Sequence, residues 1–197
     1  MKHSFTIPTE LKDVTIRQYQ AFQAIPEELT SRERYEAILK ALTSLPQTTN
    51  LNDVPHREIK NAANKAEAVL YQEPPPLKKR WLNYAINPNL SEMTALEYAE
   101  ITQLTAAGDE QLHNIMQVLY RPITSEDKKT TWWGKRKGSY RVARYEYDGA
   151  RAELFRNEMT MDVVFPVYVF FCNILTIYNA EIKLFSREQE AATTFMK

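Results

Sequence analysis

The segment LHNIMQVLYRPI, residues 112–123, decides the architecture that we expect for this chain. Its large apolar residues recur at helical spacing and predict a helix with one buried face, formed by Leu112, Ile115, Met116 and Leu119. Pro122 disfavours helical backbone in the residue before it, so the helix should end close by. A second apolar segment, VVFPVYVFFCNILTIY at residues 163–178, carries the pair Phe170 and Phe171. We expect these two segments to form the two sides of one core.

The apolar segment at residues 163–178 is shorter than the ~20 residues that a membrane span requires. It is also interrupted by Pro166 and Asn173. We therefore interpret it as a buried helix that begins after Thr160, with an exposed partner-binding helix as the alternative, and we expect no membrane partner. Pro166 should kink this helix or move its start to a later residue.

The composition favours a mainly α protein. The chain has 197 residues, of which 44% are hydrophobic, which is enough for one ordinary core. It contains only 4 glycines and is rich in residues with high helix propensity. Basic and acidic residues balance at 25 each, so no overall field directs the protein to nucleic acid or to an anionic membrane. The single cysteine, Cys172, excludes an intramolecular disulfide.

Local signals predict further helices along the chain. They cover residues 16–25, a segment capped by Thr30 and Glu33, residues 54–72 capped by Asp53, a segment from Thr94 and Glu97 to Gly108, one capped by Asp109, and one begun by Asp148. Three prolines at residues 74–76 form a stiff extended spacer. This spacer divides the chain into helical regions 1–73 and 77–197, which we expect to pack together as one compact domain.

A small β element completes the expected fold. Residues 4–7 are typical of a short strand or an extended arm that ends at Pro8. Residues 140–147 alternate and are rich in tyrosine, which indicates a strand that could pair with residues 118–123. The basic segment between them, residues 124–139, is interpreted as a loop or a loose hairpin.

The sequence contains no recognisable reaction chemistry. Phosphate-binding loops, dinucleotide fingerprints, paired-histidine zinc motifs and nucleophile elbows are absent from the sequence. We therefore expect a protein that is not an enzyme and that uses no metal or cofactor. Arg121 follows the end of a predicted helix, where a cation complements the exposed carbonyl groups.

The strongest local charge lies in residues 128–144, which contain seven cations and no acidic residue: Lys128, Lys129, Lys135, Arg136, Lys137, Arg141 and Arg144. Trp132 and Trp133 lie within the same segment and could stack on bases while the cations follow phosphates. One hypothesis is therefore a nucleic-acid contact. The alternatives are a basic loop whose tryptophans pack on the protein body, or a loop that docks on an acidic protein.

Several landmarks together resemble a group of small tailed-bacteriophage proteins. They are VTIRQYQ at residues 14–20, NPNLSEMTALEY at 87–98, LYRPI at 119–123 and FFCN at 170–173. Proteins of this group occur among virion and tail-assembly genes and are often described as tail assembly chaperones. Pro166 and the tryptophan-bearing basic loop depart from the group's pattern.

The resemblance implies a protein that acts in virion or tail assembly by packing against phage tail or other virion proteins. It implies a location in the host cytoplasm during assembly, and the N-terminus lacks the apolar stretch of a secretory signal. A permanent structural component of the head, neck or tail is the alternative, and a homo-oligomer is compatible with both. The residues that we expect to contact a partner are Tyr120, Arg121, Trp132, Trp133, Phe170 and Phe171.

Overall fold

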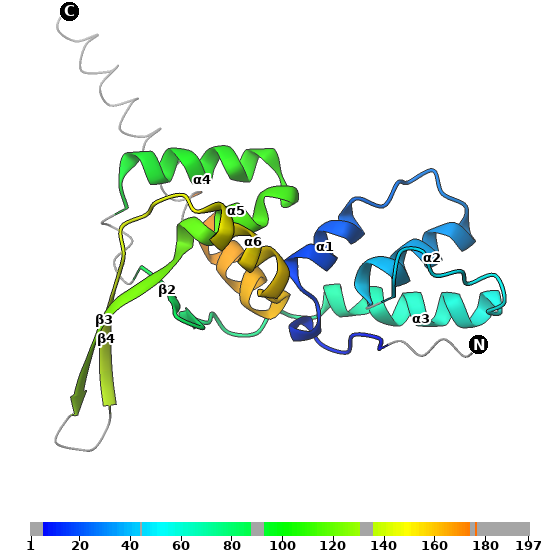
Figure 1. Cartoon of the computed structure of the whole chain (residues 1–197), viewed down its shortest axis with the longest axis horizontal. Coiled ribbons are helices and arrows are strands. Elements are labelled where there is room, and N and C mark those ends of the chain that lie inside the picture. Colours follow the sequence, from blue (N-terminus) through cyan, green and yellow to red (C-terminus); the bar gives the residue numbers. More distant parts are fainter. Residues whose placement is uncertain (1–5, 44, 88–92, 131–135, 174–175, 177–197) are drawn as a thin grey trace, which may run out of the picture.

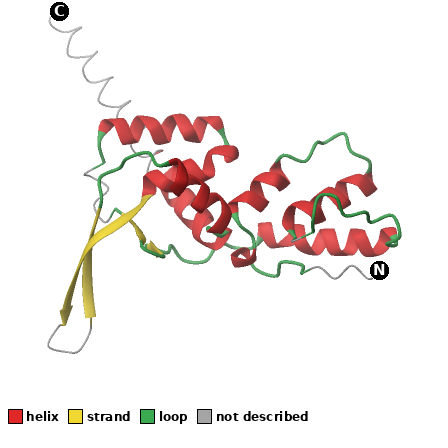
Figure 2. Cartoon of the chain, in the orientation of Figure 1, coloured by secondary structure: helices red, strands yellow, loops and turns green. Residues whose placement is uncertain are grey.

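A computed structural model describes residues 6–43, 45–87, 93–130, 136–173 and 176, with the backbone alone for residues 127–130 and 136–138. The protein is mainly helical and has a small four-stranded antiparallel sheet (Figure 2). The expected fold class is therefore confirmed. None of the helices in the described ranges is long and apolar enough to cross a membrane.

The described residues of the N-terminal half form three α-helices and two short 3-10 turns. They are η1 (Leu11–Asp13), α1 (Ile16–Gln23), α2 (Ser31–Leu42), α3 (His56–Ala68) and η2 (Val69–Tyr71). The predicted capping box of α2 is present: the Thr30 hydroxyl accepts from the Glu33 amide, and the Glu33 carboxylate accepts from the Thr30 amide. Thr15 and Gln18 form an equivalent box at α1.

The C-terminal half holds the sheet and the other helices. Its elements are β1 (Arg80–Trp81), β2 (Tyr84–Ile86), α4 (Ala95–Ala107), η4 (Asp109–Gln111), α5 (Leu112–Leu119), β3 (Tyr120–Thr130), β4 (Arg136–Val142) and α6 (Gly149–Glu158). A final helix follows, whose described part covers residues 161–173. Phe155 of α6 is fully buried and meets the ring edges of Trp81 and Tyr84, so it fixes the small β1–β2 hairpin on the helices.

The sheet has the order β1-β2-β3-β4, and every neighbouring pair is antiparallel. Tyr84 to Ile86 pair with Pro122 to Tyr120, whereas Ile123 and the residues beyond it pair with β4 alone among the described strands. A bulge between Ile123 and Ser125 marks this change. The distal part of β3 and its partner β4 therefore form a two-stranded ribbon, which extends away from the helices (Figure 1).

The core is one continuous cluster that draws buried residues from both halves of the chain. Leu112, Ile115, Met116 and Leu119 all lie in it, as their spacing predicts, together with Phe171 of the final helix. Helix α1 connects the two halves because it packs on both α2 and α6. Its Tyr19 ring meets the Phe165 ring of the final helix edge-on, with centroids 5.4 Å apart.

Some expected boundaries of the helices are wrong. The helix expected over residues 54–72 is α3 and begins after Pro55, which is its N-cap, so Asp53 does not cap it. Gln111 is the N-cap of α5, and Asp109 lies in the preceding 3-10 turn. The carboxylate of Asp109 instead accepts a hydrogen bond from the hydroxyl of Tyr19, with the oxygens 3.0 Å apart. The final helix includes the residues before Pro166, so the proline does not delay its start.

The β element also differs from expectation in its details. Residues 4 and 5 lie outside the described ranges, and residues 6–9 belong to no strand. Thr15 instead forms an isolated bridge with Thr160. Strand β4 begins at Arg136 and ends at Val142, earlier than the expected range of 140–147. It starts within residues 124–139, the segment interpreted as a loop or a loose hairpin, and the pairing with β3 confirms the hairpin alternative. The hairpin of β1 and β2 was not predicted.

Candidate interaction surface at the β-hairpin arm

The ribbon of β3 and β4 beyond Pro122, which we call the arm, is the feature that projects most plainly from the helical body (Figures 1 and 2). Its register runs from Ile123 opposite Val142 to Thr130 opposite Arg136. A two-stranded ribbon in water is marginally stable without further packing. The free edges of such a ribbon offer backbone amides and carbonyls to another chain. A partner chain that pairs with these edges would therefore stabilise the arm.

A buried ion pair fixes the base of the arm. Arg121 lies at the start of β3, and its Nη2 is 3.0 Å from Oε1 of Glu97 in the first turn of α4. The two side chains are only 6% and 8% exposed. Arg121 Nε also donates to the carbonyl of Val118, 3.1 Å away, in the last turn of α5. The predicted role of Arg121 at a helix C-terminus is therefore confirmed, and the same side chain links α5 to α4.

Glu97 performs two tasks with its two carboxylate oxygens. One oxygen pairs with Arg121, and the other accepts from the backbone amide of Thr94 at 2.7 Å. Glu97 is thus the N3 residue of the capping box that the sequence predicts for α4. Its pairing with Arg121 was not predicted, because no local pattern connects the two positions.

Tyr140 on β4 is held against the sheet by two contacts. Its hydroxyl donates to the carbonyl of Ile86 at 2.9 Å, and the Arg80 guanidinium lies 4.6 Å from its ring centroid. Burial raises the pKa of the Tyr140 hydroxyl, and the charge of Arg80 opposes that shift. Arg80 in turn pairs with Glu126 on β3 at 2.6 Å. The proximal arm is therefore tied to both β1 and β2.

A cleft of about 860 Å³ lies beside the base of the arm. Its walls are the end of β4 with the residues that follow it and the first turn of α4, and its lining consists of Asn87, Thr94, Leu96, Glu97, Arg121, Tyr140, Arg141, Val142, Ala143, Arg144 and Tyr145. The Tyr145 hydroxyl donates to Glu100 of α4 at 2.6 Å. Burial, followed by this carboxylate, raises the pKa of Tyr145.

The residues expected to contact a partner fall into separate environments. Tyr120 and Phe171 are 0% and 2% exposed, so neither side chain is available at the surface. The hydroxyl of Tyr120 donates to the carbonyl of Lys78, and burial raises its pKa. Arg121 is committed to its ion pair, whereas Phe170 is 39% exposed. Trp132 and Trp133 lie outside the described residues.

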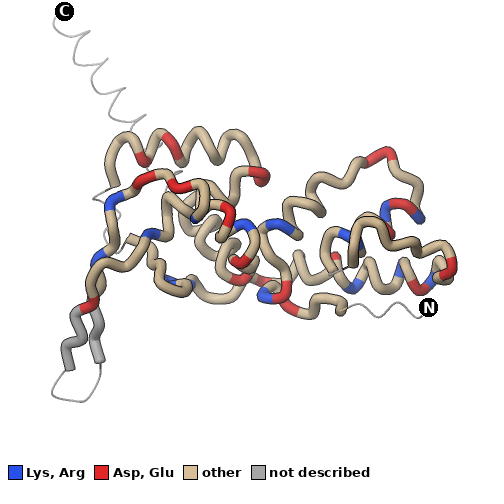
Figure 3. The backbone as a smooth tube through the Cα atoms, in the orientation of Figure 1, with Lys and Arg blue, Asp and Glu red and all other residues tan. Residues whose placement is uncertain are grey.

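The candidate nucleic-acid residues divide in the same way. Arg141 and Arg144 are exposed and line the cleft. The backbone register places Lys129 opposite Lys137, and Thr130 opposite Arg136. Lys128 also lies on β3, opposite Gly138. Lys135 lies outside the described residues. Along the rest of the described chain, acidic and basic residues are interspersed (Figure 3).

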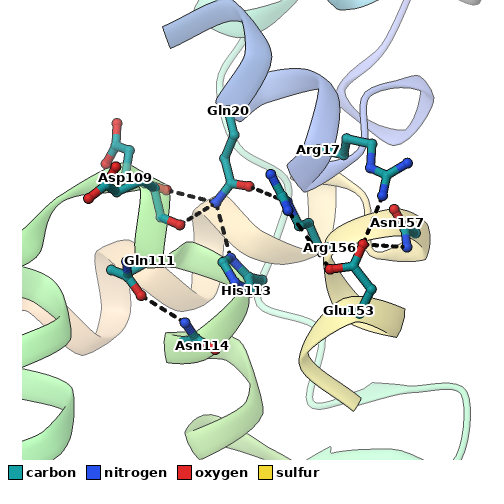
Figure 4. A network of polar contacts seen from close by, with 10 residues as sticks. Arg17, Gln20, Asp109, Gln111, His113, Asn114, Glu153, Arg156 and Asn157 are labelled. Atoms are coloured by element: carbon teal, nitrogen blue, oxygen red, sulfur yellow. Dashed lines mark hydrogen bonds and ion pairs between the residues drawn. The ribbon is translucent and has the colours of Figure 1, made fainter. Parts of the chain in front are cut away.

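A second polar cluster joins α1 to η4, α5 and α6 (Figure 4). The Gln20 amide nitrogen contacts the carbonyls of Asp109 and Glu110 and, at 3.2 Å, His113 Nδ1. The Gln20 amide oxygen accepts from Arg156 Nε at 3.0 Å. Burial and, to a smaller degree, the charge of Arg156 lower the pKa of His113. The cluster satisfies polar groups where the two halves of the chain meet, and we assign it a structural role.

The described residues contain no group of three or more His, Cys, Asp or Glu side chains placed to hold a metal ion. What they define is a helical protein with a protruding hairpin and a basic cleft at its base. No protein-family model matches the chain, and neither the curated proteins nor the solved structures include a significant match.

Proposed function

We propose that this protein is a non-enzymatic assembly factor of tailed bacteriophages, which binds tail or other virion proteins through its β-hairpin arm. The phage context is supported by the sequence landmarks, among them residues 87–98 and 119–123. The binding role is supported by one structural observation: the arm beyond Pro122 has no third strand among the described residues. Main-chain hydrogen bonds to a strand of a partner would complete such a ribbon.

The contacts at the base of the arm also hold it in a fixed orientation on the helical body. Arg121, Tyr140 and Arg80 attach its proximal residues to α4, α5, β1 and β2 through the contacts given above. A held base reduces the conformational freedom that the arm loses when it binds. A projecting ribbon on a fixed base is suited to reaching into a neighbouring subunit.

The test is co-expression of the tagged protein with the virion proteins of the same genome, followed by affinity purification. A shortened-arm variant, in which Asn-Gly replaces residues 127–139, leaves Glu126 and Tyr140 opposite each other across a two-residue turn. We expect the complete protein to retain a tail or virion protein and the shortened-arm variant to lose it. A second variant with residues 128–137 permuted keeps length and charge and tests whether the order of the residues matters.

Two results would contradict the proposal. One is that the complete protein retains no virion protein. The other is that the shortened-arm variant, with an unchanged unfolding midpoint, retains its partner as well as the complete protein does. Mass spectrometry of purified particles then separates the two assembly roles, because a chaperone should be absent from particles and a structural subunit should be present at fixed stoichiometry.

Nucleic-acid binding by the arm is a second candidate, favoured by the register that places Lys129 opposite Lys137. Cations on paired strands could follow the phosphates of a single strand. If three of them each neutralise one phosphate, raising the salt from 50 to 200 mM should weaken binding roughly 20-fold. Charge reversal at Lys135 and Arg136 should abolish it. If the affinity for an oligonucleotide changes neither with the rise in salt nor with the charge reversal, this candidate function is wrong.

A further inference from the structure

The cleft at the base of the arm carries an excess of positive charge that no described residue of its lining neutralises. Glu97 and Arg121 cancel within their ion pair, which leaves Arg141 and Arg144 as the other charged residues among the described residues of the lining. Neither guanidinium has a hydrogen-bond or ion-pair partner among the described residues. Five other arginines, Arg17, Arg32, Arg80, Arg121 and Arg156, each pair with a carboxylate, whereas the exposed Arg34 and Arg57, which lie outside the cleft, do so with none among the described residues.

Apolar surface accompanies these two charges. Leu96, in the first turn of α4, is 74% exposed at the same cleft. Val142 and Ala143 on the opposite wall are partly buried. An occupant that satisfies both guanidinium groups and covers Leu96 must therefore combine anionic and apolar groups.

The wall formed by β4 adds a preference for an extended chain. Strand β4 stands at the end of the sheet order, so its outer edge has no neighbouring strand among the described residues. Arg141 lies on this strand. A cation on an edge strand opposes pairing with a second copy of the same strand, because like charges would face each other. Such a cation favours an acidic strand instead.

The two tyrosines of the cleft, Tyr140 and Tyr145, favour a peptide over a nucleic acid as its occupant. Stacking on a base requires a free aromatic face. The Tyr140 ring already carries the Arg80 guanidinium on one side, and the hydroxyls of Tyr140 and Tyr145 are engaged by Ile86 and Glu100. An acidic peptide needs only the two arginines and the strand edge.

We infer that this cleft binds an acidic, extended segment of the partner protein, with its carboxylates on Arg141 and Arg144 and an apolar side chain on Leu96. The inference rests on the proposed assembly function and specifies the chemistry of the partner. It also separates the two parts of the arm: the proximal cleft selects charge, and the distal ribbon supplies reach.

The experiment measures binding of a fluorescent peptide of alternating glutamate and valine by anisotropy, with a peptide of alternating glutamine and valine as the neutral control. We expect the complete protein to bind the acidic peptide, and R141E/R144E to bind it at least about tenfold more weakly. Both arginines are exposed, so the variant should fold, and its unfolding midpoint checks this.

The matched control is R34E/R57E, which makes the same change in charge at exposed arginines of α2 and α3 that do not line the cleft. This control should bind within twofold of the unaltered protein. Equal weakening by both double variants, or equal binding of the acidic and neutral peptides, would overturn the inference. The inference would also be overturned if an oligonucleotide bound more tightly than the peptide and displaced it. The same holds if sedimentation showed that the unaltered protein is a dimer and that only R141E/R144E is a monomer.

Failure of this inference can be told apart from failure of the proposed function. If R141E/R144E still retains the virion protein that the shortened-arm variant loses, the arm binds the partner and the cleft does not. If the unaltered protein retains no virion protein, the assembly function itself is wrong, whatever the peptide does.

Discussion

Removing the charge of Glu97 should destabilise the protein more than any other single change of charge that we consider. The Glu97 and Arg121 side chains are 8% and 6% exposed and their charged atoms are 3.0 Å apart. Removing one partner of a buried ion pair typically costs about 3–5 kcal/mol, because the remaining charge stays buried without compensation. This cost is a decrease in the free energy of unfolding.

Glu97→Gln is the sharpest form of this perturbation. A glutamine side-chain oxygen can still accept from the Thr94 amide, so the capping contact at 2.7 Å is kept while the charge is lost. We expect a loss of about 3 kcal/mol. For a domain of this size each kcal/mol lowers the melting temperature by about 2–4 °C, so Tm should fall by roughly 6–12 °C. Glu97→Ala, which also removes the cap, should lose about 1 kcal/mol more.

Urea unfolding followed by circular dichroism measures this loss. The matched control is Glu126→Gln, because Glu126 pairs with Arg80 at 2.6 Å with side chains 36% and 42% exposed. That pair is open to solvent, so its loss should cost less than about 1 kcal/mol. The reasoning is refuted if Glu97→Gln costs no more than Glu126→Gln. The double variant E97Q/R121M should be more stable than the sum of the single losses predicts, because no unpaired charge remains.

Three further predictions concern other parts of the fold. Gly108 has a φ of +97° and open space where a Cβ would lie, so Gly108→Ala should cost about 1–3 kcal/mol through backbone strain alone, measured by urea unfolding. Phe155→Ala should cost about 3–5 kcal/mol and loosen the β1–β2 hairpin, seen as faster amide exchange at Ala85, since Phe155 is 0% exposed beneath Trp81. The pKa of His113 is lowered from its ordinary value of 6.5, so the unfolded chain takes up the proton first and the protein loses stability as the pH falls below 6.5. His113→Gln should remove that component between pH 7.5 and 5.5, and an unchanged pH dependence would contradict it.

Local interactions account for the features that were predictable. The capping boxes at Thr30 and Thr94 act over three residues, so sequence spacing alone identifies them. The buried face of α5 and the start of α6 at Asp148 follow from equally short patterns. Arg121 was placed correctly at the end of a helix because that role requires only the carbonyl of Val118.

The failures occur where a tertiary contact overrides a local pattern or where an element is too short to show one. Asp109 is typical of an N-cap, but its carboxylate is used by Tyr19 of α1, which is distant in sequence. Strands β1 and β2 have two and three residues, too few for an alternating pattern to be recognised. Tyrosine is a residue type that often contacts partners, yet Tyr120 lies at the start of β3 with its side chain buried in the core.

The amino-acid sequence is sufficient to predict that this protein is mainly helical, where most of its helices lie, and that its positive charge is concentrated near residues 128–144. The folded protein adds what the sequence does not predict: a buried ion pair fixes the base of the arm, the arm projects as a ribbon, and a cleft beside it has Arg141 and Arg144 on its wall. Helix propensity and capping depend on neighbours a few residues away. Pairing Glu97 with Arg121, and leaving Arg141 without a carboxylate, depend instead on which distant segments the completed core brings together.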